Sequence, residues 1–441
     1  MIESNYEEVH SKEWIKRNIS DPSKDLVILR NLIPWERTIK QLVQYYDQEK
    51  GAIGKNLRMM AAIVLLMRLR GFSDRGVIAE IQENRYMQHF CNISDEQLST
   101  FIDHSTICKF RRRLGVEGMA MIENEIFQHL RRSGAIANEM SLIDSTVLES
   151  NIIYPNDVHL VFSAIKRMSL WAKKHKVALW FNHSQVKKLW RRFHQDKQAN
   201  RLEYLQLFDD LFTPALSDFE SISPQSRLSQ AAVLEAESLV ALFKILDKQT
   251  QLKLTGEVHI KDRLVSLKEV DARPIQKGKA FPDCEFGTTN QMCFNRQGFL
   301  IHCQILPGAP KDKTLYPSTL EAYIQRMEGN PWASVSDGGF RSEKNLKAHA
   351  DEIQVIFMGS GEDVKEEEQE AALSARSATE GFIAVAKNLR GFGKSLYVGL
   401  RGDQIWASLN QAAYNLKKFL QLYREEAYDE SVLIALGLWS R

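Results

Sequence analysis

The chain has 441 residues, more than a single hydrophobic core usually supports, so two or three domains are expected. Its 44% hydrophobic and 26% charged residues are typical of globular proteins, which excludes the disordered and fibrous classes. The five cysteines are scattered without a Cys-x-x-Cys pair, which argues against a disulfide framework or a zinc site. The longest apolar run, residues 61–67, is far shorter than the ~20 residues of a membrane-spanning helix. We therefore expect a cytoplasmic protein that makes no contact with a membrane.

The N-terminal part of the chain has the apolar spacing of helices. In residues 57–68, apolar side chains recur at intervals of three and four, and Gly71 is well placed to end that helix. Another short helix is expected to begin near Ser73. The helical pattern predicts a small helical domain over residues 1–138, similar to a helix-turn-helix module.

A basic helix is expected near the end of this domain. Ser105 or Thr106 can cap it, and its apolar face would carry Ile107, Phe110 and Leu114. Four basic side chains then point mostly elsewhere and are candidates for contact with DNA: Lys109, Arg111, Arg112 and Arg113. Contact with phosphates alone and a role in dimerisation are the alternatives for this helix.

A strand is expected at Ser141–Leu148, where apolar and β-branched residues gather. Alternate residues of a strand share a face, so Asp144 would lie on the same face as Leu142 and Leu148. An ionised carboxylate loses its hydration in such a strand unless it is paired or bound to a metal. Asp144 is therefore either half of a buried structural pair or a metal ligand.

Residues 155–265 return to helical spacing and are expected to form an insertion after this strand. Within it, residues 163–201 contain eleven Lys or Arg and one acidic residue, a net charge of +10. This charge favours binding of nucleic-acid phosphates, with a solvated helix surface as the alternative. The candidate contacts are Lys173, Lys174, Lys187, Lys188, Arg191 and Arg192. The interleaved Trp171, Trp180 and Trp190 are more often core residues than platforms for stacked bases.

The rest of the chain alternates between strand and helix patterns. A hairpin is expected over residues 286–306, with its turn at residues 295–298. After it come, in order, a helix at 315–327, a strand at 332–336, a helix at 343–350, a strand at 353–358, and helices at 374–390 and 403–423. This order predicts an α/β domain with a mixed sheet and flanking helices.

Two further acidic residues stand in positions suited to metal binding. Asp337 follows a strand and precedes two glycines, and ligands of α/β sheets lie at such strand ends. Glu380 lies in a helix on one stripe with Arg376 and Lys387, because spacings of four and seven return to nearly the same helix face. Two Asp and one Glu supply the oxygen ligands that Mg²⁺ prefers. Glu368 and Glu370 compete for the third place but lack these basic companions.

The pattern around Glu380 resembles the signature of DDE transposases of bacterial insertion sequences, in which Tyr, Arg, Glu and Lys are separated by two, three and six residues. Arg376, Glu380 and Lys387 match this signature, whereas Leu373 stands at the Tyr position. The boxes Asp144-Ser-Thr and Asp337-Gly-Gly-Phe also look like those of the family. The resemblance implies a ribonuclease-H-like catalytic domain over residues 139–154 and 266–441, interrupted by a basic helical insertion over 155–265 that separates the two Asp residues in sequence.

The resemblance also implies what the protein binds and does. Asp144, Asp337 and Glu380 would hold two Mg²⁺ ions, for which Mn²⁺ can substitute, and these would cleave DNA and join its 3′ ends to a target. Four cations are implied as DNA contacts: Arg376, Lys387, Lys277 and Lys279. Double-stranded DNA is the expected partner, as transposon ends and as target, bound by a homodimer in the bacterial nucleoid. No GxxxxGK motif is present, so use of ATP is not expected.

Two other functions stay open at this point. One is a ribonuclease-H-like nuclease that cuts DNA without joining it, which would use the same three acids. The other is a DNA-binding regulator without enzymatic activity, built on a transposase scaffold. The presence of all three acids favours an enzyme over the regulator.

Overall fold

The computed structural model describes residues 7–47, 54–178, 183–222, 228–276, 284–359 and 365–438. Lys277, Lys279 and Trp180 lie outside these ranges, so their predicted roles have no structural counterpart here. The chain divides into two compact units. Unit 1 comprises 1–148, 289–306 and 310–441, and unit 2 comprises 149–288 and 307–309. Among the described helices, none combines the length and apolar character needed to cross a membrane.

Unit 1 begins with the helices that the apolar spacing predicted. They are α1 (Lys12–Asn18), α2 (Asp25–Leu32), α3 (Trp35–Leu42), the short 3-10 helix η1 (Val43–Tyr45), α4 (Leu57–Arg70), α5 (Asp74–Glu83), α6 (Arg85–Cys91), α7 (Asp95–Ser99) and α8 (His104–Arg132). Gly71 ends α4 in the left-handed conformation, with φ of +74°, as expected. The hydroxyl of Ser73 then accepts from Gly76 N at 3.0 Å and caps α5.

Helix α8 differs from the prediction at its start and in its middle. Its N-cap is Asp103, whose carboxylate accepts from Ser105 N at 2.9 Å, so neither Ser105 nor Thr106 caps it. The expected apolar face is confirmed, because Ile107, Phe110 and Leu114 are buried. Gly115 adopts φ of +64° and divides α8 into two helical segments.

Over the described residues, the sheet contains six strands and is mixed, as expected. These are β1 (Met140–Glu149), β2 (Arg273–Gln276), β3 (Cys284–Phe294), β4 (Leu300–Leu306), β5 (Ala333–Ser336) and β6 (Val355–Met358). Their order is β2-β3-β1-β5-β6, with β4 paired to β3. The pairs β2–β3 and β3–β4 are antiparallel, whereas β1–β5 and β5–β6 are parallel. Strand β2 has no counterpart in the sequence prediction.

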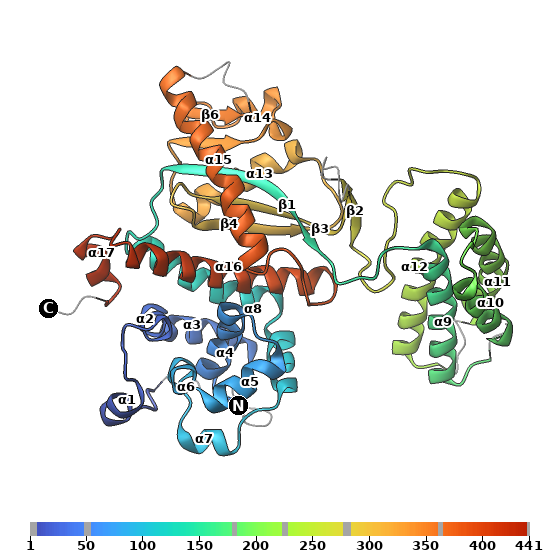
Figure 1. Cartoon of the computed structure of the whole chain (residues 1–441), viewed down its shortest axis with the longest axis horizontal. Helices are drawn as coiled ribbons and strands as arrows, with labels where there is room; N and C mark the ends of the chain where they lie inside the picture. The colour runs from blue at the N-terminus through green and yellow to red at the C-terminus, as the bar shows by residue number, and fades with distance from the viewer. Residues whose placement is uncertain are drawn as a thin grey trace. The chain divides into compact units, whose positions relative to one another are not determined.

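Helices cover both faces of the sheet (Figure 1). Ile143 belongs to a core shared with α13 (Asp312–Met327), whereas Leu142 and Leu148 belong to a core shared with α15 (Glu366–Leu389). Successive β1 side chains therefore alternate between the two faces, as the strand pattern predicted. Helix α15 begins at Glu366 rather than near residue 374, because acidic side chains at its first turn interact favourably with the helix dipole.

The remaining helices of unit 1 are α14 (Glu343–Lys347), α16 (Gly399–Arg424) and α17 (Glu430–Ala435). Helix α16 packs against α4 and α8 on one side and against β4 on the other, so it lies between the N-terminal helices and the sheet (Figure 1). A second link is the ion pair in which Arg326 of α13 donates to the buried Glu123 of α8 at 2.7 and 3.0 Å. The N-terminal helices and the sheet thus form one packed body within unit 1.

The described residues of the 155–265 tract form four helices in unit 2. They are α9 (Asp157–His175), α10 (His183–Gln195), α11 (Arg201–Ile222) and α12 (Gln230–Leu254). Their core includes Trp171, Phe208, Phe219 and Phe243. The ring of Trp190 stacks on Phe162, with centroids 3.9 Å apart. Both described tryptophans of the basic tract are thus packing residues.

Candidate active site at the ends of two parallel strands

Asp144 and Asp337 occupy equivalent positions on neighbouring parallel strands. The pairing of β1 with β5 ends with Ile143 opposite Ser336, and each Asp is the next residue along its strand. Paired strands lie about 4.8 Å apart, so the register brings the two residues side by side. Strand β1 continues to Glu149 while the chain leaves the sheet after β5. This divergence opens the sheet edge at the two carboxylates.

Local hydrogen bonds hold both carboxylates. Asp337 caps the 3-10 helix η2 (Gly338–Phe340), where its Oδ1 accepts from Gly339 N at 2.9 Å. Asp144 Oδ1 accepts from Ser145 N at 2.6 Å. Both side chains are half-buried, so ligands in solvent can reach them. Adjacent carboxylate oxygens are donors that fit a hard divalent cation, and without one the two negative charges repel each other.

Gly359 permits a close approach to the backbone that follows Asp337. A Cβ built on Gly359, which follows β6, would lie 2.5 Å from Gly338 N and 2.6 Å from its Cα. Gly359 also has φ of +76°. The loop that carries Asp337 is therefore packed directly on the end of β6, which fixes the direction in which this carboxylate leaves the sheet.

A third acidic residue, Asp312, lies near Asp337 and next to Ser145, and it was not predicted. The hydroxyl of Ser145 donates to Asp312 Oδ1 at 2.8 Å. A Cβ built on Gly339 would lie 3.1 Å from Asp337 Oδ1 and 3.3 Å from Asp312 Oδ2, so both carboxylates border the space beside Gly339. The only local signal in the sequence is that Asp312 follows a Pro-Gly-Ala-Pro turn and begins a helix.

Glu380 lies on α15, as predicted, and its side chain is exposed. Its neighbour Thr379 is buried against the sheet, and successive helix residues are about 100° apart, so Glu380 lies at the border of that interface. Arg376 and Lys387 on the same stripe are half-buried. Over the described ranges, no three His, Cys, Asp or Glu side chains are arranged to hold a metal ion. The β1–β5 register thus places Asp144 and Asp337 at neighbouring positions, and Glu380 as the third ligand stays a prediction.

The basic helix α8 presents three of its four predicted DNA contacts. Lys109, Arg112 and Arg113 are exposed, and the Arg113 guanidinium lies 4.5 Å from the ring centroid of Tyr46. Arg111 is buried instead, and its Nη1 and Nη2 donate to the two Asp74 oxygens at 2.8 and 2.6 Å. The Arg111 guanidinium is therefore engaged in an internal ion pair, and its contact with DNA stays a prediction.

The ion pair with Arg111 also explains why the pKa of Asp74 is lowered. Burial opposes ionisation of Asp74, yet hydrogen bonds from Arg111 and Cys108 keep the pKa of its carboxyl below the usual value. The same guanidinium lies 4.6 Å from the ring centroid of Tyr397. Arg111 thus connects α5 and α8 with the segment that precedes α16.

In unit 2, the predicted DNA contacts gather on the outer side of α10 and at the end of α9. Val186, Leu189 and Trp190 pack toward the core of the unit. Six cationic side chains predicted to contact DNA are all exposed: Lys173, Lys174, Lys187, Lys188, Arg191 and Arg192. One of them, Lys174, forms an ion pair with Glu235 at 2.8 Å. The basic tract is therefore an outward-facing surface of a packed helical bundle.

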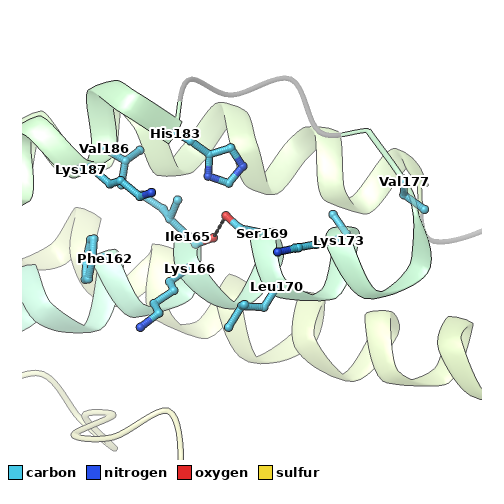
Figure 2. Close-up of a pocket in the computed structure, with 11 residues that line it drawn as sticks. Phe162, Ile165, Lys166, Ser169, Leu170, Lys173, Val177, His183, Val186 and Lys187 are labelled. Atoms are coloured by element: carbon cyan, nitrogen blue, oxygen red, sulfur yellow. Dashed lines mark hydrogen bonds between the residues drawn. The ribbon is translucent and has the colours of Figure 1, made fainter.

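A pocket of about 560 Å³ lies between α9 and α10 (Figure 2). Its walls are apolar, with Ile165, Leu170 and Val186 among them, and Lys173 and Lys187 contribute cations. The one hydroxyl, that of Ser169, donates to Ile165 O at 2.8 Å within α9. None of the residues that line it is a carboxylate, so this pocket is chemically distinct from the Asp144 and Asp337 site.

Comparison with known proteins relates part of the chain to transposition. Residues 14–113 match the family model described as Transposase domain (DUF772), which spans α1 to the first half of α8 and ends two residues before the kink at Gly115. The chain is also 29% identical over 174 residues to the uncharacterized protein ORF8 in the nfe locus of Rhizobium meliloti, covering 38% of this chain and 83% of that protein. No solved structure matches the chain. These similarities support a transposase-related protein.

The contrast between Arg111 and Arg112 gives a test of the α8 surface. We expect Arg111→Ala to lower the free energy of unfolding by about 1.5–3 kcal/mol, because it removes charge-assisted hydrogen bonds from a partly buried Asp74. Arg112→Ala, at an exposed position of the same helix, should change it by less than about 0.5 kcal/mol. Urea unfolding monitored by circular dichroism measures both values, and equal values for the two variants would contradict the assignment.

Proposed function

We propose that the chain is a DDE transposase that binds the ends of an insertion sequence, cleaves the phosphodiester bond at each end and joins the 3′ ends to target DNA. The observation that carries this proposal is the β1–β5 register, which sets Asp144 beside Asp337 at the end of two parallel strands. The match of residues 14–113 to a transposase domain supports it independently. The two lines of support come from different parts of the chain.

The sheet supports a ribonuclease-H-like catalytic domain in this proposal. Its first three strands in chain order, leaving aside β2, are β1, β3 and β4, and β3 pairs antiparallel with β4. Strands β5 and β6 then extend the sheet in parallel on the other side of β1. The first acid lies on the first strand and the second acid follows β5, which is the arrangement that the family resemblance implies.

Each proposed residue has a defined part in the chemistry. Asp144 and Asp337 would hold Mg²⁺ or Mn²⁺, with Glu380 as the third acid once α15 is arranged on DNA. Ions held by these acids would supply the Lewis acidity that activates a water or a 3′-hydroxyl for attack and that stabilises charge on the leaving oxygen. Arg376 and Lys387 hold DNA phosphates, the first through a planar fork and the second as a point charge.

Other parts of the chain bind the DNA itself. The exposed Lys109, Arg112 and Arg113 of α8 lie in or beside the matched transposase domain and would contact the transposon ends. Lys277 and Lys279 are retained as proposed contacts from the family resemblance. We propose that a homodimer joins the two transposon ends to target DNA, because both ends must reach the same target site. The basic face of α10 would bind duplex phosphates outside the active site.

The proposed activity is tested by incubating the protein with precut terminal DNA, a target plasmid and Mg²⁺. Wild type should give joined product, and Asp337→Asn and Glu380→Gln should each lower its rate by roughly 1000-fold, since charge stabilisation by a metal is worth several kcal/mol. Glu370→Gln, which changes an exposed acid on the same helix, is the matched control and should be unaffected. Cleavage without joining would identify a nuclease, and DNA binding without either reaction would identify the regulator.

The α10 surface is tested by the salt dependence of DNA affinity. Each phosphate contact contributes ~0.9 to the slope of log affinity against log salt concentration, so Lys187→Ala with Arg191→Ala should lower the slope by about 1.8 on random-sequence duplex. Lys244→Ala with Lys248→Ala removes the same charge from exposed positions of α12 and should leave the slope unchanged. Equal slopes for the two double variants in fluorescence anisotropy titrations would remove α10 from the DNA interface.

A further inference from the structure

We propose that Asp312 is a positioning residue for the reaction at Asp144 and Asp337, and that its charge strengthens the binding of a divalent cation there. This inference rests on the proposed function, because it assigns Asp312 a part in the same site. Asp312 is the first residue of α13 and is distant in sequence from both carboxylates. Its place at the site follows from two separate observations.

The first contact joins Asp312 to the strand that carries Asp144. Ser145 follows Asp144 on β1, and its side chain leaves the opposite face of the strand. The Ser145 hydroxyl donates to Asp312 Oδ1 at 2.8 Å, while Ser145 N donates to Asp144 Oδ1 at 2.6 Å. One residue of β1 therefore links the two carboxylates, and Asp312 restrains the strand where it diverges from β5.

The second observation places Asp312 near the loop that carries Asp337. A Cβ on Gly339 would lie between the two carboxylates, 3.1 Å from Asp337 Oδ1 and 3.3 Å from Asp312 Oδ2. Such distances are tighter than ordinary van der Waals contact, so only glycine leaves this space open. Asp312 Oδ2 and Asp337 Oδ1 thus border the same small volume.

The charge of Asp312 has a direct electrostatic consequence. Asp312 lies in the first turn of α13, where the helix dipole favours a negative charge. The carboxylate of Asp312 borders the same space as Asp337 Oδ1, and its negative charge there increases the affinity of the site for a cation. Asp312 does not need to contact the ion to raise the cation affinity, because it is hydrogen-bonded to Ser145 and lies close to the site. Groups that orient the ligands of a metal in this way typically affect its affinity by about 10–100-fold.

The test compares binding of Mn²⁺ to the full-length protein and its variants, with free Mn²⁺ measured by electron paramagnetic resonance. Asp312→Asn keeps an oxygen that can accept the Ser145 hydrogen bond but removes the charge, and we expect it to weaken Mn²⁺ binding about 10–100-fold. Its unfolding temperature without metal should match wild type. Asp351→Asn, at an exposed position of unit 1, is the control and should bind Mn²⁺ like wild type.

Gly339→Ala provides an independent variant, because the added methyl group displaces both carboxylates without changing their charge. It should also weaken Mn²⁺ binding. The proposal is overturned if Asp312→Asn binds Mn²⁺ like wild type, or if it lowers the unfolding temperature of the metal-free protein and leaves Mn²⁺ affinity intact. A different result would show that the proposed function itself is wrong. In that case Asp337→Asn would bind Mn²⁺ with the same affinity as wild type.

Discussion

The parallel pairing of β1 with β5 is the constraint on which the candidate site depends. Because Leu142 is paired with Val335 and Ile143 with Ser336, the next residues, Asp144 and Asp337, occupy corresponding positions where the two strands part. A shift of one residue would turn every β1 side chain to the opposite face of the sheet and bury Asp144 against α13. The apolar residues on both faces therefore maintain the register that the two carboxylates require.

The same packed body carries the N-terminal helices. One hydrophobic core runs from α4 through Phe419 of α16 to Tyr323 of α13 and Ile143 of β1. Half-buried cations reinforce this contact: the Arg68 guanidinium lies 4.1 Å from the centroid of the Trp406 ring, and Arg326 pairs with Glu123. A transposase domain that binds DNA ends through α8 would thus be rigidly coupled to the sheet that carries the acids. Unit 2 has its own core and supplies a separate basic surface.

Local patterns predicted most elements, because alternation and helical spacing are properties of neighbouring residues. The strands around Asp144 and Asp337 and the helix with Glu380 were found in this way. What the sequence could not reveal were contacts between distant residues. Arg111 pairs with Asp74, 37 positions away, and Ser145 with Asp312, 167 positions away, so periodicity assigned the first to DNA and overlooked the second. The place of Glu380 relative to the two Asp residues likewise depends on tertiary packing.

The central claim is that Asp144 and Asp337 form one cation site. It is tested most directly by replacing Mg²⁺ with Fe²⁺ and mapping the protein backbone cuts that hydroxyl radicals make around the bound ion. A shared ion should produce cuts near both residue 144 and residue 337, and both sets should be lost in Asp337→Asn. Cuts near only one of the two residues, or cuts that persist unchanged in Asp337→Asn, would contradict it.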